Sequence, residues 1–270
     1  MMATDVAITL QVIGSSLRSI AEEIGAVLIR GAYSSNIKER RDCSAALFDA
    51  RGRMVAQAEH IPVHLGAMPV AVRAVMDRGP APGDVFILND PFSGGTHLPD
   101  ITLVSPMVLD GEIAGYAVTR AHHSDVGGMT PGSMPADSRS IFQEGLVIPP
   151  VRLVDRGALD EDVLRLLLAN VRTPEIRRGD LRAQVAANEL AGRRLRELAE
   201  QRGRDVLEAA FTDVLDYTER GTRDTLRALP DGVYAAAGEI EGDGFSDTDI
   251  PLRVKVTIAG DELAIDFAGS

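Results

Sequence analysis

The sequence is nearly free of cysteine and poor in large aromatic side chains. Cys43 is the single cysteine, tryptophan is absent, and the 270 residues include only seven phenylalanines and four tyrosines. One cysteine excludes an internal disulfide and is typical of a reducing compartment. The shortage of aromatic rings also argues against stacking platforms for nucleic-acid bases.

A surplus of basic residues and long apolar runs are absent as well. The formal net charge is −12, whereas a nucleic-acid surface needs a basic patch to meet phosphates. No apolar run is long enough to span a bilayer, and the N-terminus lacks the basic region and apolar core of a signal peptide. We therefore expect a cytoplasmic protein whose partners include neither nucleic acid nor a membrane.

Apolar periodicity and turn residues predict the order of helices and strands. Residues 5–32 carry apolar side chains at the three-and-four spacing of a buried helix face. The dipeptide Asp110-Gly111 is a strong signal for a tight hairpin turn. Further helices are expected at 67–77, 159–171, 174–201 and from 203 to about 229, and strands at 43–48, 54–58, 85–88, 101–108, 112–120, 141–154, 232–240, 250–258 and 262–267.

This pattern predicts an α+β fold with a mixed or antiparallel sheet, an N-terminal helix and a central helical segment. We expect a metal-site α+β region at 1–158, a helical region at 159–230 and the start of a C-terminal β region at 231–270. The sequence ends directly after a strand without a terminal cap, so we expect a fragment of a longer subunit. The mixed charges of residues 177–204 are interpreted as solvated helix faces.

All five histidines lie between residues 60 and 123. His97 and Asp100 are separated by two residues, and His122 and His123 follow a predicted strand. Imidazole and carboxylate together suit a divalent ion such as zinc, manganese or iron. The alternative is a polar loop whose histidines are hydrogen-bonded within a core.

The predicted hairpin favours convergence of these residues. His97 and Asp100 precede its first strand, and His122 and His123 follow its second. An antiparallel hairpin brings its two open ends together, so these residues become neighbours in space.

Other polar motifs leave alternatives open. His60 and His64 are separated by Pro62, which argues against a shared helix face; they belong either to a pocket wall or to ordinary packing. The charged run 38–42 is most simply a solvated turn. The glycine-rich segment 92–96 lacks the Gly-Lys-Ser/Thr ending of a phosphate-binding loop, so no nucleotide site is predicted.

Four segments resemble a known family. NIKERRDCSAALFD, AQAEHIPVHLGAM, GDVFILNDPFSGGTHLPDITLVSP and AHHSDVGG are similar to the hydantoinase B family, and the resemblance covers essentially the whole chain. That family holds B subunits of ATP-dependent hydantoinases and lactamases, the matching half of 5-oxoprolinase, and a subunit of acetone and acetophenone carboxylases.

The resemblance implies a set of metal ligands. His97, Asp100 and His122 match the family's metal-binding positions. A fourth ligand is expected from the charged turn, Glu39 with Asp42 as the nearby alternative.

The resemblance also implies supporting residues. His123 and Asp125 are expected to orient ligands or to transfer a proton, and Asp90 could orient His97. Metal-bound histidines normally need such partners.

The implied function is ATP-coupled opening of a cyclic amide or imide in a hetero-oligomer. A hydantoinase A-like subunit would bind ATP and phosphorylate the substrate, and this chain would supply the metal site. One alternative is a subunit of an acetone- or acetophenone-type carboxylase acting on a ketone. Another is a non-catalytic scaffold.

Overall fold

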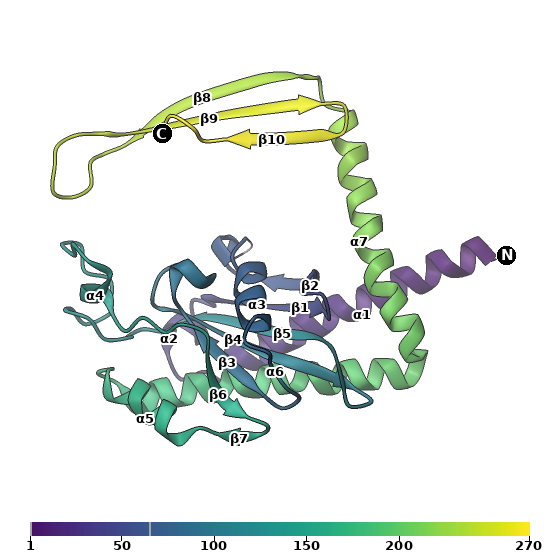
Figure 1. Cartoon of the computed structure of the whole chain (residues 1–270), viewed down its shortest axis with the longest axis horizontal. Helices are drawn as coiled ribbons and strands as arrows, with labels where there is room; N and C mark the ends of the chain where they lie inside the picture. The colour runs from purple at the N-terminus through teal and green to yellow at the C-terminus, as the bar shows by residue number, and fades with distance from the viewer. Residues whose placement is uncertain (1, 65) are drawn as a thin grey trace. The chain divides into compact units, whose positions relative to one another are not determined.

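The computed structural model describes residues 2–64 and 66–270 (Figure 1). It contains two compact units, Met1–Phe211 and Thr212–Ser270. The boundary between them falls within helix α7 (Arg204–Arg227). The division of the sequence into regions at residues 158 and 230 stays a prediction.

The first unit is built on a seven-stranded sheet in the order β2-β1-β5-β4-β3-β6-β7. All of its strand pairs are antiparallel, and together with the helices they confirm the predicted α+β fold. The strands are β1 (Cys43–Asp49), β2 (Met54–Glu59), β3 (Val85–Leu88), β4 (Asp100–Leu109), β5 (Glu112–His122), β6 (Val151–Asp155) and β7 (Ala158–Leu159).

The predicted long helices are all present. The helical elements are α1 (Met2–Gly31), α2 (Ser35–Lys38), η1 (Pro62–His64), α3 (Met68–Met76), η2 (Pro91–Ser93), α4 (Ile141–Glu144), α5 (Glu161–Ala169), α6 (Pro174–Arg202) and α7. The expected extended segment 141–154 is wrong in its first part, which forms α4. Ser140 and Gln143 form a capping box there, and their reciprocal hydrogen bonds stabilise a helical turn.

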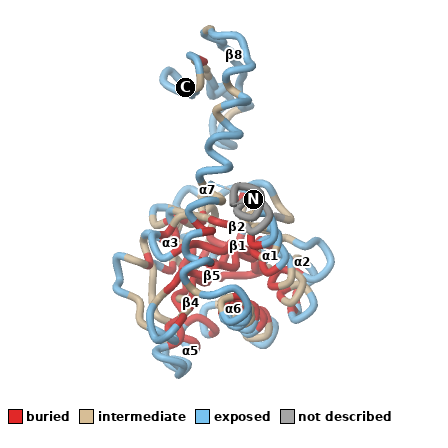
Figure 2. Tube along the Cα trace, turned by 90° about the vertical axis from the view of Figure 1, so that its right-hand side faces the viewer, coloured by how far each residue is buried: buried red, intermediate tan, exposed pale blue. Residues whose placement is uncertain are grey.

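The two faces of the sheet carry alternate residues of each strand (Figure 2). Ala46, Phe48, Val104 and Val118 pack on one face with α3. Intervening residues such as Leu103 point to the opposite face, where they pack with α5 and α6. Helix α1 runs along α6 and covers β1 and β2. The face covered by α3 is called the α3 face below, and the other the α6 face.

Helix α6 is less solvated than its charges predict. Arg177 and Asp180 are 3% and 0% exposed and form an ion pair of 2.9 Å between Nη2 and Oδ2. The expectation of solvated faces is therefore wrong for the start of this helix, because its charged side chains there point into the sheet.

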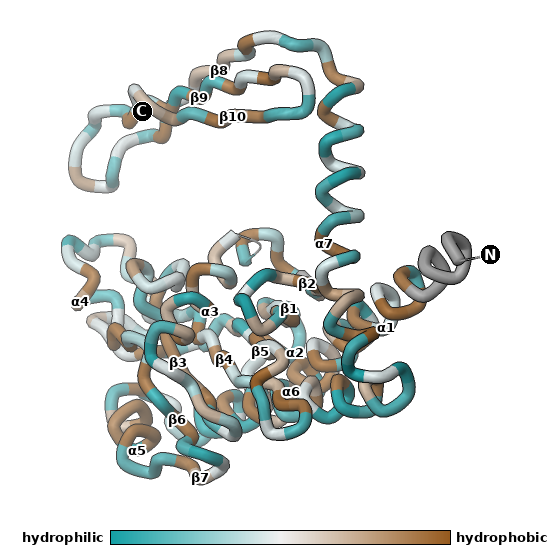
Figure 3. The backbone as a smooth tube through the Cα atoms, turned by 45° about the vertical axis from the view of Figure 1, so that its right-hand side comes forward, coloured by the Kyte–Doolittle hydropathy of each residue, from teal (hydrophilic) through white to brown (hydrophobic). Residues whose placement is uncertain are grey.

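The second unit contains a three-stranded antiparallel sheet in the order β10-β9-β8. Its strands are β8 (Gly232–Ile240), β9 (Ile250–Ala259) and β10 (Glu262–Asp266), close to the predicted ranges. Hydrophobic and hydrophilic positions alternate along β9 and β10 (Figure 3). One face of this small sheet is therefore apolar.

Candidate metal centre

The strand register places three predicted ligands side by side. Asp100, the first residue of β4, pairs with His122, the last residue of β5. On the other side of β5, the carbonyl oxygen of Asp42 accepts a hydrogen bond of 3.0 Å from the His122 backbone N–H. Directly paired residues of neighbouring antiparallel strands share a face. The side chains of Asp42, His122 and Asp100 therefore gather at one end of the α3 face.

The β4–β5 turn explains why the two strand ends meet. Asp110 and Gly111 have φ angles of 50° and 82°, the two positive values that a type I′ turn requires. The convergence argued from the hairpin is confirmed by the Asp100–His122 pairing.

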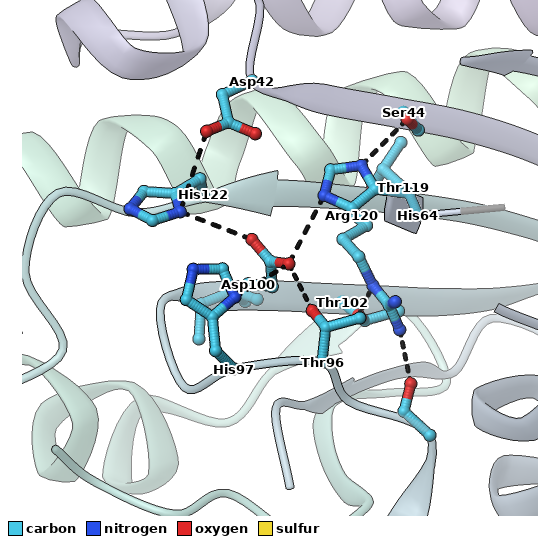
Figure 4. Close-up of polar contacts among 12 residues, drawn as sticks. Asp42, Ser44, His64, Thr96, His97, Asp100, Thr102, Thr119, Arg120 and His122 are labelled. Carbon is cyan, nitrogen blue, oxygen red and sulfur yellow. Dashed lines mark hydrogen bonds and ion pairs between the residues drawn. The ribbon is translucent and has the colours of Figure 1, made fainter. Parts of the chain in front are cut away.

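The carboxylate of Asp100 is the centre of the cluster (Figure 4). Its oxygens lie 3.2 Å from His97 Nδ1, 3.5 Å from His122 Nδ1 and 3.4 Å from His64 Nε2. A second carboxylate oxygen, from Asp42, lies 3.7 Å from His122 Nδ1. The Thr96 hydroxyl donates to Asp100 Oδ2. Three imidazoles and two carboxylates thus surround one small volume.

Two combinations of these side chains could share an ion. One atom each from His97, Asp100 and His122 lies within 4.8 Å of the others, and the same holds for Asp42, His64 and Asp100. His64 Nε2 and Asp100 Oδ1 are buried, and neither makes a hydrogen bond within residues 2–64 and 66–270. Unpaired buried polar atoms are costly unless another ligand satisfies them. The donor set therefore fits a divalent metal ion.

His64 is the member of the cluster that the sequence left undecided. The short helix η1 turns its ring towards β4, and Ser44 Oγ lies 2.9 Å from its Nδ1. That contact leaves Nε2 facing Asp100. A signal for this placement was the position of His64 in a segment, 56–68, that resembles the hydantoinase B family.

Charge in the cluster is held by its neighbours. Burial alone would raise the pKa of Asp100, but polar contacts from His122, His64, His97 and Thr96 together hold it well below its ordinary value. The contact with Asp100 raises the pKa of His97, against the opposing effect of burial. Asp100 is therefore an ionised carboxylate.

Exposure decreases across the cluster. The His97 and Asp42 side chains are 38% and 29% exposed, whereas those of His64 and Asp100 are 1% exposed. The cluster is therefore open to a substrate on the side of His97 and Asp42.

The loop that carries His97 is held by residues that sequence reasoning did not single out. Asn89 Nδ2 donates to Leu98 O at 2.8 Å, and Asn89 Oδ1 accepts from the Ile148 backbone. Arg120 is fully buried and donates to the Gly94 carbonyl oxygen. Arg120 stands two residues before His122 on β5, so strand alternation alone could have placed both on the same face.

The remaining carboxylates and His60 lie outside the cluster. Glu39 is exposed at the C-cap of α2 and belongs to neither combination, whereas Asp42, its alternative, belongs to one. Asp90 accepts hydrogen bonds from Phe92 N and Ser93 Oγ within its own turn. The His60 ring packs near Gly25 of α1.

His123 and Asp125 are close in sequence to the cluster, but they face α6. His123 Nε2 lies 2.9 Å from Gln184 Oε1 of α6, and burial lowers the pKa of the ring, which is therefore neutral. Asp125 forms an ion pair of 2.9 Å with Arg172. Consecutive residues of an extended strand point to opposite faces, so His122 and His123 diverge.

An α+β domain with this buried histidine and carboxylate cluster belongs to the class of proteins built to hold a divalent metal at the end of a sheet. The chain is a member of the hydantoinase B/oxoprolinase family, whose family model matches residues 6–270.

Similar proteins include the B component of a putative D-/L-hydantoinase from Pseudomonas sp., 36% identical over 97% of this chain and 46% of that protein. The crystal structure of the ATP-dependent caprolactamase from Pseudomonas jessenii superposes with a TM-score of 0.89 at 35% identity, covering 96% of this chain and 45% of that one. A nucleotide-free acetone carboxylase structure also superposes with a TM-score of 0.89, at 22% identity, over 98% and 37% of the two chains. The last likeness shows the fold alone.

The chain spans less than half the length of these relatives. Within the described residues, none of the helices has both the length and the apolar character needed to cross a membrane.

Proposed function

We propose that this chain supplies the metal-dependent site of an ATP-coupled hydrolase that opens a cyclic amide or imide of the hydantoin, 5-oxoproline or lactam type. The single observation that carries the proposal is the cluster of Asp42, His64, His97, Asp100 and His122, with buried atoms that lack hydrogen bonds. Relatives named as a hydantoinase component and as a caprolactamase favour a cyclic amide as substrate.

The partner in this proposal is a hydantoinase A-like subunit in a hetero-oligomer, as the names of relatives suggest by describing them as single subunits. That partner would bind ATP and phosphorylate the amide oxygen, which makes the ring carbon electrophilic. No ATP site is assigned to this chain.

Zinc, manganese or iron suits the donor set. Such an ion supplies Lewis acidity and lowers the pKa of water towards about 7. His64 and Asp100 would hold it from the buried side, and His97, His122 and Asp42 from the side open to substrate. Of the roles expected for His123 and Asp125, their position on the α6 face supports orientation of neighbouring chain segments.

The test begins with elemental analysis and circular dichroism of the wild type and three variants. His97→Ala and His122→Ala are expected to stay folded and to lose near-stoichiometric metal. His60→Ala removes a histidine outside the cluster and is expected to retain the metal. Unfolding of His122→Ala would favour the scaffold alternative, and a wild type without metal would remove the main support for the proposal.

Activity is then measured with the hydantoinase A-like subunit, ATP and a panel of cyclic amides. Ring opening is expected only when both subunits and ATP are present. Strong ring opening by this chain alone, without ATP, contradicts the proposal. Incorporation of labelled bicarbonate into a ketone would identify the carboxylase alternative.

A further inference from the structure

Three polar side chains form a buried stripe on α6. Asp180, Gln184 and Asn188 follow one another at intervals of four residues and are at most 2% exposed. Residues four apart lie on one helix face, and this face contacts β4 and β5. Burying polar groups is costly unless they are hydrogen-bonded, so their partners indicate their role.

Gln184 bonds beside two of the metal-site residues at once. Its Nε2 donates to the Ile101 carbonyl oxygen at 3.0 Å, and its Oε1 lies 2.9 Å from His123 Nε2. Because the amide nitrogen of Gln184 faces a carbonyl, its oxygen must accept from the His123 ring. Ile101 follows Asp100 and His123 follows His122. One carboxamide therefore holds the residues next to two candidate ligands.

Asp180 holds the segment that leads to Asp42. Its Oδ1 accepts from the backbone N–H groups of Tyr33 and Ser34 at 2.7 and 3.0 Å. Ser34 is the N-cap of α2, and Asp42 N donates back to Asn36 O in that helix at 3.0 Å. The position of α2 therefore depends on Asp180, and the position of Asp42 depends on α2.

We propose that Gln184 and Asp180 are positioning residues that hold the ends of β1, β5 and β4 in register from the α6 face. The proposal rests on the metal site proposed above, because that site needs Asp42, His122 and Asp100 at fixed separations. Neither positioning side chain contacts the cluster. They act through Ile101, His123 and the Ser34 turn.

Asn188 provides a matched control on the same helix. Its Nδ2 donates to Leu103 O at 3.2 Å and to Ser105 Oγ at 3.0 Å. The chemistry is that of Gln184, with a carboxamide bonded to β4 from a buried helix position. Its partners lie farther along the strand from Asp100.

The experiment compares Gln184→Met with Asn188→Leu. Each variant loses a buried carboxamide, so both are expected to lower the melting temperature. Zinc affinity, measured by competition with a chelator, is expected to fall about 10- to 100-fold in Gln184→Met, as for partners that orient metal ligands. In Asn188→Leu it is expected to stay within about threefold of wild type. Equal losses of affinity in the two variants would overturn the proposal.

Hydrogen exchange of the metal-free proteins supplies a second, independent readout. The amides of His122 and His123 donate to Asp42 O and Pro99 O at 3.0 and 2.8 Å, across the two strand contacts that Gln184 is proposed to hold. These amides are expected to exchange faster in Gln184→Met and at the wild-type rate in Asn188→Leu. Unchanged exchange in Gln184→Met would overturn the proposal.

Exchange also separates this proposal from the proposed function. If the wild type binds no metal, the proposed function fails while the exchange comparison still decides the role of Gln184. If Gln184→Met does not fold, Gln184→Asn takes its place. The shortened carboxamide is expected to weaken zinc binding relative to Asn188→Leu, and wild-type affinity in Gln184→Asn would overturn the proposal.

Discussion

Asp125 joins three segments of the chain through one carboxylate. Its Oδ1 accepts from the backbone N–H groups of Gly127 and Arg172, and its Oδ2 pairs with the Arg172 side chain at 2.9 Å. Burial alone would raise the pKa of Asp125, but hydrogen bonds from Arg172 and Gly127 outweigh it and lower the pKa. The folded state therefore favours ionised Asp125.

The pH dependence of stability follows from this direction. Because the folded pKa lies below the unfolded value of 3.8, the stabilisation is present above pH 3.8 and is lost as the pH falls through the folded value. Asp125→Asn is expected to lower the free energy of unfolding by about 1–3 kcal/mol at neutral pH. The difference from wild type should shrink in acid. Urea titrations at neutral pH and in acid would measure it, and a difference that grows in acid would contradict this account.

At this scale, the site residues divide according to what fixes them. His97, Asp100 and His122 were predictable because an Asp-Gly hairpin brings their strand ends together. The choice between Glu39 and Asp42 depends on which residue directly precedes β1 and pairs with β5, and a strand boundary in a run of alternating charges does not reveal it. His64 depends on η1, a short turn without a periodic pattern.

At the scale of elements, two glycines on either side of β4 have different roles. Gly94 has a φ of 94°, and an added Cβ would overlap the backbone of Ala71 in α3. Gly111 has a φ of 82°, and an added Cβ would meet nothing within 4 Å. The first glycine permits close packing between η2 and α3, whereas the second only permits the turn.

This contrast predicts the effects of two alanine substitutions. Gly111→Ala is expected to cost about 1–2 kcal/mol of stability, from backbone strain alone, and to retain the metal. Gly94→Ala is expected to cost more and to weaken metal binding, because the loop carrying Thr96 and His97 must shift. Thermal melting and elemental analysis would measure both effects. Equal metal affinity in the two variants would show that the loop does not position His97.

Elements with a clear period were predictable, and those defined by local hydrogen bonds or by tertiary contacts were not. Strand β3 and the β4–β5 hairpin follow from apolar runs and turn residues. Helix α4 depends on the capping box of Ser140 and Gln143. The buried stripe of Asp180, Gln184 and Asn188 was hidden by the many charges of α6, although its interval of four residues was visible in the sequence.

At the scale of the whole molecule, burial is unevenly distributed. The core clusters lie in the first unit. In the second unit, one face of the β8–β10 sheet carries apolar side chains that are 40–56% exposed: Ile240, Ile250, Leu252, Leu263 and Ile265. Within residues 212–270 no helix or strand covers this face.

That face has a consequence for the colloidal behaviour of the chain. Its net charge of −12 opposes contact between molecules, but salt screens that repulsion beyond about 8–10 Å and strengthens apolar association. Ammonium sulfate is therefore expected to raise the light-scattering mass with protein concentration. Ile265→Lys should suppress the rise, whereas Val233→Lys, on the opposite face, should not. Equal effects would exclude this face as the cause. Solubility during purification would thus be set by one patch of the second unit and would worsen as salt is added.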